Sequence, residues 1–202
     1  MSEQFLDRVY GARDEGETRA LYDKWAASYE TEVSQNGYAT PGRCAKALAD
    51  ITADQSAPLL DFGCGTGLSG LALKLAGFEN IDGVDLSLEM LAQARSKGVY
   101  RDLEQVTAGF TPAAGVYSNI AAIGVIGSGA APVDALDTLM KALPSGGRLV
   151  FSFNDHTLED PVFEARVSEW TDCGAARLLF RERGDHLPGR DMKSIVYILE
   201  KA

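Results

Sequence analysis

Cysteine and histidine are scarce in this chain of 202 residues. The cysteines are Cys44, Cys64 and Cys173, and the histidines are His156 and His186. A disulfide framework needs a denser set of cysteines, and a structural zinc site needs closely spaced Cys or His ligands. We therefore expect no disulfide and no metal centre, and a reducing, cytoplasmic compartment.

Clusters of basic side chains are missing as well. The chain has 19 Lys and Arg against 29 Asp and Glu, which gives a formal net charge of −10. A protein of this sign repels a phosphate backbone, so the composition argues against a nucleic-acid partner. The arginines near the C-terminus (Arg177, Arg181, Arg183 and Arg190) alternate with acids, which predicts a solvated hairpin.

Long apolar runs are also absent. No segment approaches the roughly 20 apolar residues of a membrane-spanning helix. The N-terminus carries charges at Glu3, Asp7 and Arg8 and has no apolar stretch of signal-peptide length. Hydrophobic residues make up 46% of the chain and charged residues 24%, which is typical of a globular protein. The length suffices for one domain but not for two of ordinary size, so we expect a single domain over residues 1–202 without a membrane partner.

What the sequence does contain is a glycine-rich segment after a short apolar run. Residues 59–67 read LLDFGCGTG, with Asp61 inside the apolar run and three alternate glycines after it: Gly63, Gly65 and Gly67. This pattern is typical of a buried strand that turns sharply into a helix, because glycine adopts positive φ angles and has no Cβ to hold a ligand away. Cys64 has no neighbouring base, so we assign it a backbone role in the loop and not that of a nucleophile.

A second acid follows the next apolar run. Residues 80–84 read NIDGV and end at Asp85, roughly 20 residues beyond the central glycine. Nucleoside-binding folds place a carboxylate there, since its two oxygens suit two neighbouring ribose hydroxyls. Ser87 is a typical cap for the helix that follows, and capping is the alternative role of Asp85. The two motifs together predict a site for a nucleoside-containing cofactor.

Short apolar runs alternate with helical segments after Pro58. We expect strands at 59–62, 81–84, 98–100, 116–123 and 148–153, and helices at 68–76, 87–97, 134–143 and 160–172. Strands that alternate with helices predict a parallel sheet with right-handed crossovers. The first 55 residues are instead helical, with one helix over 18–33 and a second that opens at Thr40-Pro41.

The C-terminal part breaks this alternation. Two segments that we expect to be strands, 177–183 and 194–199, have no helix between them and are joined by a turn over 184–190. They predict an antiparallel hairpin on the sheet edge. His186 falls in the turn, so we expect it to be exposed and structural.

The motif DxGxGxG at 61–67, followed by DLS at 85–87, resembles the class I S-adenosylmethionine-dependent methyltransferases. The resemblance extends over residues 22–201, and the terminal hairpin distinguishes that family from nicotinamide-binding sheets. Residues 22–29 (YDKWAASY) and the later pair Gly37-Tyr38 are loosely similar to the methyltransferase-like proteins of the Williams–Beuren region.

The resemblance implies an α/β fold with a doubly wound, mostly parallel sheet of seven strands in the order 3-2-1-4-5-7-6. It also implies a C-terminal antiparallel hairpin and a helical lid. The lid would comprise residues 1–55, and the Rossmann-like core residues 56–202. The cofactor implied is S-adenosylmethionine.

The resemblance implies a position for each part of this cofactor. The backbone of the glycine loop, including Cys64, would border the methionine part, and Asp61 would meet its amino group. Asp85 would bind the ribose, and Leu86 and Met90 would line the adenine pocket. A place in the core is the alternative role of Met90.

Further residues come from later segments. Asp102, with Leu103, would follow the third strand and accept the adenine amino group, although capping a helix is an equal alternative. Ile123, with Gly124, would lie at the methyl end. Tyr22 and Tyr29 would reach the cofactor from the lid, but they share one helical face, so packing is their alternative role.

The sulfonium of the cofactor is already activated, so the protein mainly has to align an acceptor and exclude water. If a base is needed, Asp155 and His156 are the candidates, because they follow the fifth strand at its carboxyl end; a polar turn is the alternative. The fourth strand ends in AAIG (121–124) and lacks the Asn/Asp-Pro-Pro-aromatic run of enzymes that methylate nucleic-acid amino groups. We therefore expect a small-molecule acceptor, with a protein acceptor still open.

Two functions of other classes stay open at this point. Residues 65–70 (GTGLSG) also fit the GxGxxG motif of a nicotinamide-dependent oxidoreductase. Residues 115–132 are rich in Gly and Ala and offer few catalytic groups, which would suit a module that binds the adenosyl cofactor without catalysis. The oligomeric state is not encoded in any pattern that we recognise.

Overall fold

The computed structural model of the chain describes residues 30, 31, 33 and 35–202. The predicted lid residues Tyr22 and Tyr29, and most of the predicted helix 18–33, lie outside the described residues. Their roles, and the division into lid and core, stay predictions.

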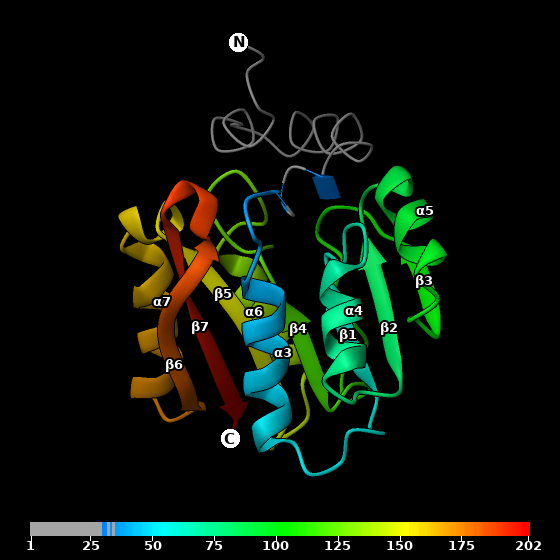
Figure 1. The fold of residues 1–202 in the computed structure, drawn as a ribbon. Coiled ribbons are helices and arrows are strands. Elements are labelled where there is room, and N and C mark those ends of the chain that lie inside the picture. Colours follow the sequence, from blue (N-terminus) through cyan, green and yellow to red (C-terminus); the bar gives the residue numbers. More distant parts are fainter. Residues whose placement is uncertain (1–29, 32, 34) are drawn as a thin grey trace.

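A seven-stranded sheet forms the centre of the protein (Figure 1). Its order is β3-β2-β1-β4-β5-β7-β6, as predicted. The strands are β1 (Leu59–Phe62), β2 (Ile81–Asp85), β3 (Asp102–Gln105), β4 (Asn119–Ala122), β5 (Arg148–Asn154), β6 (Ala176–Leu187) and β7 (Met192–Lys201). Strands β1 to β5 run parallel, whereas β7 is antiparallel to both β5 and β6. The predicted fold class is therefore confirmed.

Helices cover both faces of this sheet (Figure 1). They are α3 (Thr40–Ile51), α4 (Leu68–Leu75), α5 (Leu88–Ser96), α6 (Asp134–Ala142) and α7 (Val162–Asp172), with short 3₁₀ helices at Thr157–Glu159 and Pro188–Arg190. Successive strand residues point to opposite faces, so Leu59 packs with α3 and α4 while Leu60 packs with α6 and α7. No helix in the described part of the chain is long and apolar enough to cross a membrane.

The predicted third strand was placed too early in the chain. The structure has no strand at 98–100, and β3 begins at Asp102. Because β3 lies at the sheet edge and three of its four residues are exposed, its sequence lacks the apolar pattern of a buried strand. Tyr100, which suggested the earlier strand, precedes β3 and turns its hydroxyl toward Asp61.

The hairpin is longer than predicted, and its turn is shorter. Strand β6 runs through Leu187, so residues 184–187 are extended and the reversal occurs at 188–191. This places His186 inside the strand, where it is only 6% exposed. The expectation that His186 is exposed was wrong because the turn was predicted too early: His186 belongs to β6, where Thr40 of α3 packs against it.

Candidate functional site

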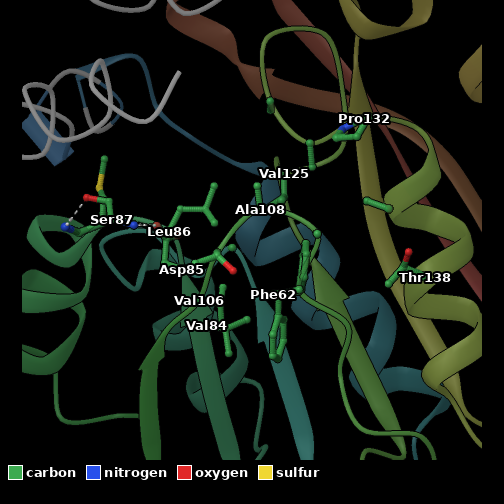
Figure 2. Close-up of a pocket in the computed structure, with 18 of the residues that line it drawn as sticks. Phe62, Val84, Asp85, Leu86, Ser87, Val106, Ala108, Val125, Pro132 and Thr138 are labelled. Carbon is green, nitrogen blue, oxygen red and sulfur yellow. Dashed lines mark hydrogen bonds between the residues drawn. The ribbon is translucent and has the colours of Figure 1, made fainter. Parts of the chain in front are cut away.

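A pocket of about 310 Å³ lies at the carboxyl ends of the parallel strands. Figure 2 shows its labelled residues coming from the ends of β1 and β2, from the segments after β3 and β4, and from α6. The strand order reverses between β1 and β4, and open α/β sheets bind their ligands at such a switch point. The position of the pocket therefore makes it the candidate site.

The glycine loop leaves β1 in a conformation that suits glycine. Gly63, Gly65 and Gly67 have φ values of 69°, 52° and 90°. A Cβ on Gly63 would lie 2.6 Å from Cγ2 of Val125, so this glycine allows the segment after β4 to pack on the loop. Gly65 has no neighbour within 4 Å of that position, which leaves its backbone accessible to a ligand.

Asp61 is completely buried beneath this loop. Its Oδ2 accepts hydrogen bonds from Ser69 Oγ at 2.6 Å and from the Tyr100 hydroxyl at 2.7 Å. Burial raises the pKa of the Asp61 carboxyl to about 6, although these two hydrogen bonds oppose the shift. We call these three residues the Asp61 cluster.

The Asp61 cluster depends on a glycine that the sequence analysis explained differently. A Cβ on Gly70 would lie 2.2 Å from the Tyr100 hydroxyl, and the Gly70 N–H donates to that hydroxyl at 3.2 Å. Gly70, the last glycine of the GxGxxG match, therefore makes room for a tyrosine. Sequence reasoning missed Ser69 and Tyr100, and only the conspicuous third glycine could have pointed to a close contact.

Asp85 connects the end of β2 to the glycine loop. Its Oδ2 accepts from the Gly65 N–H at 2.8 Å, and its Oδ1 accepts from the Ser87 N–H at 2.9 Å. Ser87 in turn caps α5, as predicted, by accepting from the Met90 N–H. These two bonds fix the carboxylate in place at the pocket, which Asp85 lines.

Apolar side chains form most of the remaining wall. Leu86 and Met90, both predicted for an adenine pocket, line the cavity together with Phe62. Residues 106–110, after β3, also line the pocket, and the Val106 N–H donates to the Asp85 carbonyl at 3.0 Å, so this segment begins beside the end of β2. This segment, which showed no regular sequence pattern, occupies the place predicted for Asp102.

Asp102 and Leu103 do not lie where they were predicted. They begin β3 instead of following it, and neither lines the pocket. Asp102 is exposed, and its Oδ1 accepts from the Leu103 N–H at 2.9 Å. The error follows from the misplaced third strand, and this geometry gives no support to a contact with adenine.

Ile123 and Gly124 line the pocket at the end of β4. Gly124 has a φ of 70°, and its N–H donates to Ser152 Oγ at 3.1 Å. A Cβ on Gly124 would lie 2.6 Å from the hydroxyl of Tyr38, so this hydroxyl rests against the Gly124 backbone. Tyr38 was noted in the sequence without any assigned role in the site.

The proposed bases Asp155 and His156 face the hairpin and their own turn. Asp155 accepts from Arg183 Nη2 at 2.5 Å and from the Lys193 N–H at 2.9 Å. His156 Nδ1 lies 3.5 Å from Oε2 of Glu159. Neither residue lines the pocket, so their placement favours the structural alternative, and a catalytic role stays a prediction.

The thiols and possible metal ligands offer no competing chemistry in the described part of the chain. Cys64 is buried, and burial raises the pKa of its thiol, which fits a backbone role and disfavours a nucleophile. No group of three or more His, Cys, Asp or Glu residues is arranged to hold a metal ion within residues 30, 31, 33 and 35–202.

The sequence of the chain is similar to those of known methyltransferases. Residues 37–202 match a family model described as a methyltransferase domain. Methyltransferase-like protein 27 of Homo sapiens is 32% identical over 143 residues, which cover 68% of this chain. The aligned region covers 58% of that human protein, so the chain spans less than two thirds of the relative's length.

Solved structures share the fold. Magnesium protoporphyrin IX methyltransferase from Synechocystis PCC 6803, with bound S-adenosylmethionine, is 16% identical, has a TM-score of 0.59, and aligns over 98% of this chain and 90% of its own. A chain in the complex of the Haloferax volcanii Trm112 methyltransferase activator with a methyltransferase is 14% identical and has a TM-score of 0.67. That alignment covers 91% of this chain and 97% of the other.

Proposed function

The chain belongs to the class I S-adenosylmethionine-dependent methyltransferases, and on that basis we propose that it transfers the methyl group of this cofactor to a small-molecule acceptor. The supporting observation is the pairing of two motifs at the pocket. The Asp85 carboxylate, which lines the pocket, accepts a hydrogen bond of 2.8 Å from the Gly65 N–H of the glycine loop.

The residues present fit the cofactor in shape and in polarity. Gly65 leaves space for a methionine backbone, and Asp85 offers oxygens to the ribose hydroxyls. Two buried oxygens, Asp61 Oδ1 in β1 and Thr66 Oγ1 in the loop, have no hydrogen-bond partner among the described residues. Buried polar atoms are normally satisfied, so a bound polar ligand or an ordered water is the expected partner.

In this assignment Leu86, Met90 and residues 106–108 surround the adenine, and Ile123 and Gly124 border the methyl end. When bound, the cofactor would supply a methyl group on a sulfonium: an acceptor heteroatom would form a bond to the methyl carbon in line as the C–S bond breaks, and the neutral thioether S-adenosylhomocysteine would leave. The chain contributes by holding the reactants in line and by excluding water with an apolar wall. Asp155 and His156 stay the proposed bases for an acceptor that must lose a proton before it reacts.

The charge of the chain bears on the acceptor. A formal net charge of −10 disfavours nucleic acid, and the apolar lining between α6 and residues 106–110 suits a small, largely apolar molecule. All three cysteines are free thiols, two of them buried, which supports the proposal of a reducing, cytoplasmic location.

The other two functions have less support. The antiparallel β7 between β5 and β6 is the arrangement expected for a methyltransferase, and a nicotinamide-dependent oxidoreductase would place a parallel strand there. A module that binds the cofactor without catalysis has no observation in its favour beyond the apolar character of the wall.

The first test is calorimetric titration of the protein with S-adenosylmethionine, S-adenosylhomocysteine and NADH. We expect micromolar binding of the two adenosyl compounds and none of NADH. Binding of NADH alone would contradict the proposal. A second stage would follow the transfer of a labelled methyl group to a library of small molecules, with a nucleic-acid and a protein mixture as controls; a protein that binds the cofactor and labels nothing would fit the non-catalytic module.

A further inference from the structure

The segment before α3 brings a tyrosine to the end of β4. The Tyr38 hydroxyl occupies the space that a Cβ of Gly124 would fill, at 2.6 Å from that position. Gly124 is itself fixed by the Ser152 hydroxyl, to which its N–H donates at 3.1 Å. Gly124 lines the pocket after β4, whereas Tyr38 itself does not, so the Tyr38 hydroxyl reaches the site only through this contact with Gly124.

The ring of Tyr38 packs against a buried histidine, His186. The rings of Tyr38 and His186 meet edge to face, with centroids 5.2 Å apart and an interplanar angle of 82°. The Ala39 N–H donates to the His186 carbonyl at 3.0 Å, which ties the segment after Tyr38 to β6. The orientation of the Tyr38 ring thus depends on its contact with β6 of the hairpin as well as on the local backbone.

The histidine is fixed in turn by a chain of buried hydroxyls. Thr40 Oγ1 lies 2.8 Å from His186 Nδ1 and 2.9 Å from Ser194 Oγ, and all three residues are buried. Arg43 Nη1 donates to Ser194 Oγ at 3.1 Å. The guanidinium can only donate, so one consistent arrangement has Ser194 donating to Thr40 and Thr40 donating to Nδ1 of a neutral imidazole. We call Thr40, His186 and Ser194 the His186 cluster.

We propose that the Tyr38 hydroxyl contacts the methyl acceptor, and that His186 is the residue that positions it. This inference rests on the proposed function, which puts the methyl end of the cofactor beside Gly124. A phenol oxygen at that point can accept a hydrogen bond from an acceptor that carries a proton on its reacting atom, such as an amine or an alcohol. The hydrogen bond would orient the lone pair of that atom toward the methyl group.

Cofactor analogues test the position of Tyr38 without knowledge of the acceptor. Sinefungin carries an amine where S-adenosylmethionine has its methylsulfonium, whereas S-adenosylhomocysteine has no group there. If Tyr38 faces this point, the change Tyr38→Phe removes a charge-assisted hydrogen bond to sinefungin, and its affinity should fall about tenfold. The affinity for S-adenosylhomocysteine should stay within about twofold of the original value.

The matched control is Tyr117→Phe. The Tyr117 hydroxyl donates to Asp82 Oδ2 at 3.1 Å. Tyr117 precedes β4, so this contact lies at the amino ends of the parallel strands, whereas the pocket lies at their carboxyl ends. We expect this change to alter neither affinity. An equal loss for both analogues in Tyr38→Phe, or no loss for either, would overturn the proposal. A wild-type protein that binds neither analogue would instead overturn the proposed function.

The positioning role of His186 needs a separate readout. In His186→Ala the Tyr38 ring loses its edge-to-face neighbour, so sinefungin affinity should fall several-fold more than S-adenosylhomocysteine affinity. A residue that only stabilises the fold would lower the melting temperature and leave the ratio of the two affinities unchanged. That second outcome would remove His186 from the proposal.

Discussion

The Asp61 cluster and the His186 cluster are built differently: the first joins β1 to α4 and to the segment before β3, and the second joins the start of α3 to β6 and β7. The first joins Asp61 to Ser69 and Tyr100, which are 8 and 39 positions away in the chain. The second joins Thr40 to His186 and Ser194, 146 and 154 positions away. A contact between neighbouring elements, such as that of Asp61 with Ser69, can fall within a local sequence motif, whereas contacts with distant segments, such as those of Tyr100 and His186, leave no such motif.

The two clusters also differ in the ionisable group at their centre. Burial raises the pKa of the Asp61 carboxyl to about 6 and lowers that of His186 to about 4. Desolvation disfavours the charged form in both cases, but for an acid and a base this has opposite effects on pKa. The comparison therefore predicts that the two clusters contribute to stability with opposite dependence on pH.

Removal of Asp85, which holds the glycine loop above Asp61, should have the largest effect. The property affected should be cofactor affinity. Asp85→Ala removes the acceptor of the Gly65 and Ser87 N–H groups as well as the oxygens proposed for the ribose. We expect S-adenosylhomocysteine affinity to fall about a hundredfold or more, measured by calorimetry.

The control for this change is Asp102→Ala. Asp102 is an exposed aspartate outside the pocket, so its removal should leave the affinity unchanged. Should Asp102→Ala weaken binding as strongly as Asp85→Ala, the assignment of the ribose to Asp85 would be wrong and the original prediction for Asp102 would regain support.

Overpacking of the Asp61 cluster should have the next largest effect. In Gly70→Ala the new methyl group would meet the Tyr100 hydroxyl, which would have to leave its hydrogen bond to Asp61. We expect a loss of about 2 to 3 kcal/mol in the free energy of unfolding, measured by urea denaturation.

Gly42→Ala is the matched change on the other side of the comparison. Gly42 is an exposed residue of α3 with no atom within 4 Å of the added methyl group. This substitution should stabilise the protein by up to about 1 kcal/mol, because alanine favours the helix. Similar effects of the two changes would show that the contact between Gly70 and Tyr100 is not tight.

The smallest effect, and the sharpest contrast, concerns pH. The ordinary pKa of Asp61 is 3.8 and its folded value is about 6, so its contribution to stability is present below about pH 4 and is lost as the pH rises through 6. The ordinary pKa of His186 is 6.5 and its folded value is about 4, so its contribution is present above pH 6.5 and is lost as the pH falls through 4.

Variants that do not titrate isolate these two contributions. Between pH 4 and 6.5 the stability of the wild type relative to Asp61→Asn should fall with rising pH, and that relative to His186→Gln should rise. Each difference should be on the order of 2 kcal/mol across this range, from urea denaturation at several pH values. Slopes of the same sign would contradict the contrast between the clusters.

Much of the fold could be predicted because the central strands are buried on both faces. Strands β1, β2 and β5 read as apolar runs, and Thr40-Pro41 opens α3 at the predicted residue. The edge strand β3 was misplaced since exposed strands carry no apolar signal, and Tyr100 supplied a misleading one. The length of β6 was missed because many of its residues are polar and exposed. They are held in the strand by pairing with β7, which leaves no apolar pattern in the sequence.

Some residues of the candidate site could likewise be predicted from the sequence, and others could not. Asp85 and the glycine loop could be located because their spacing follows from the geometry of one strand, one turn and one helix. The contacts of Tyr38 and Tyr100 could not be located, since each depends on where a distant segment passes. The apolar segment 106–110 could be neither placed nor assigned, because nonspecific packing does not require particular residues.

The position of β7 has a consequence for how the protein is made. Strand β7 lies between β5 and β6, yet both of these leave the ribosome before it. Until residues 192–201 emerge, β5 has an unpaired edge and β6 has no partner strand. Such edges are the surfaces on which nascent chains pair wrongly, so the interval before β7 emerges is the one in which mispairing of β5 and β6 is expected to be easiest.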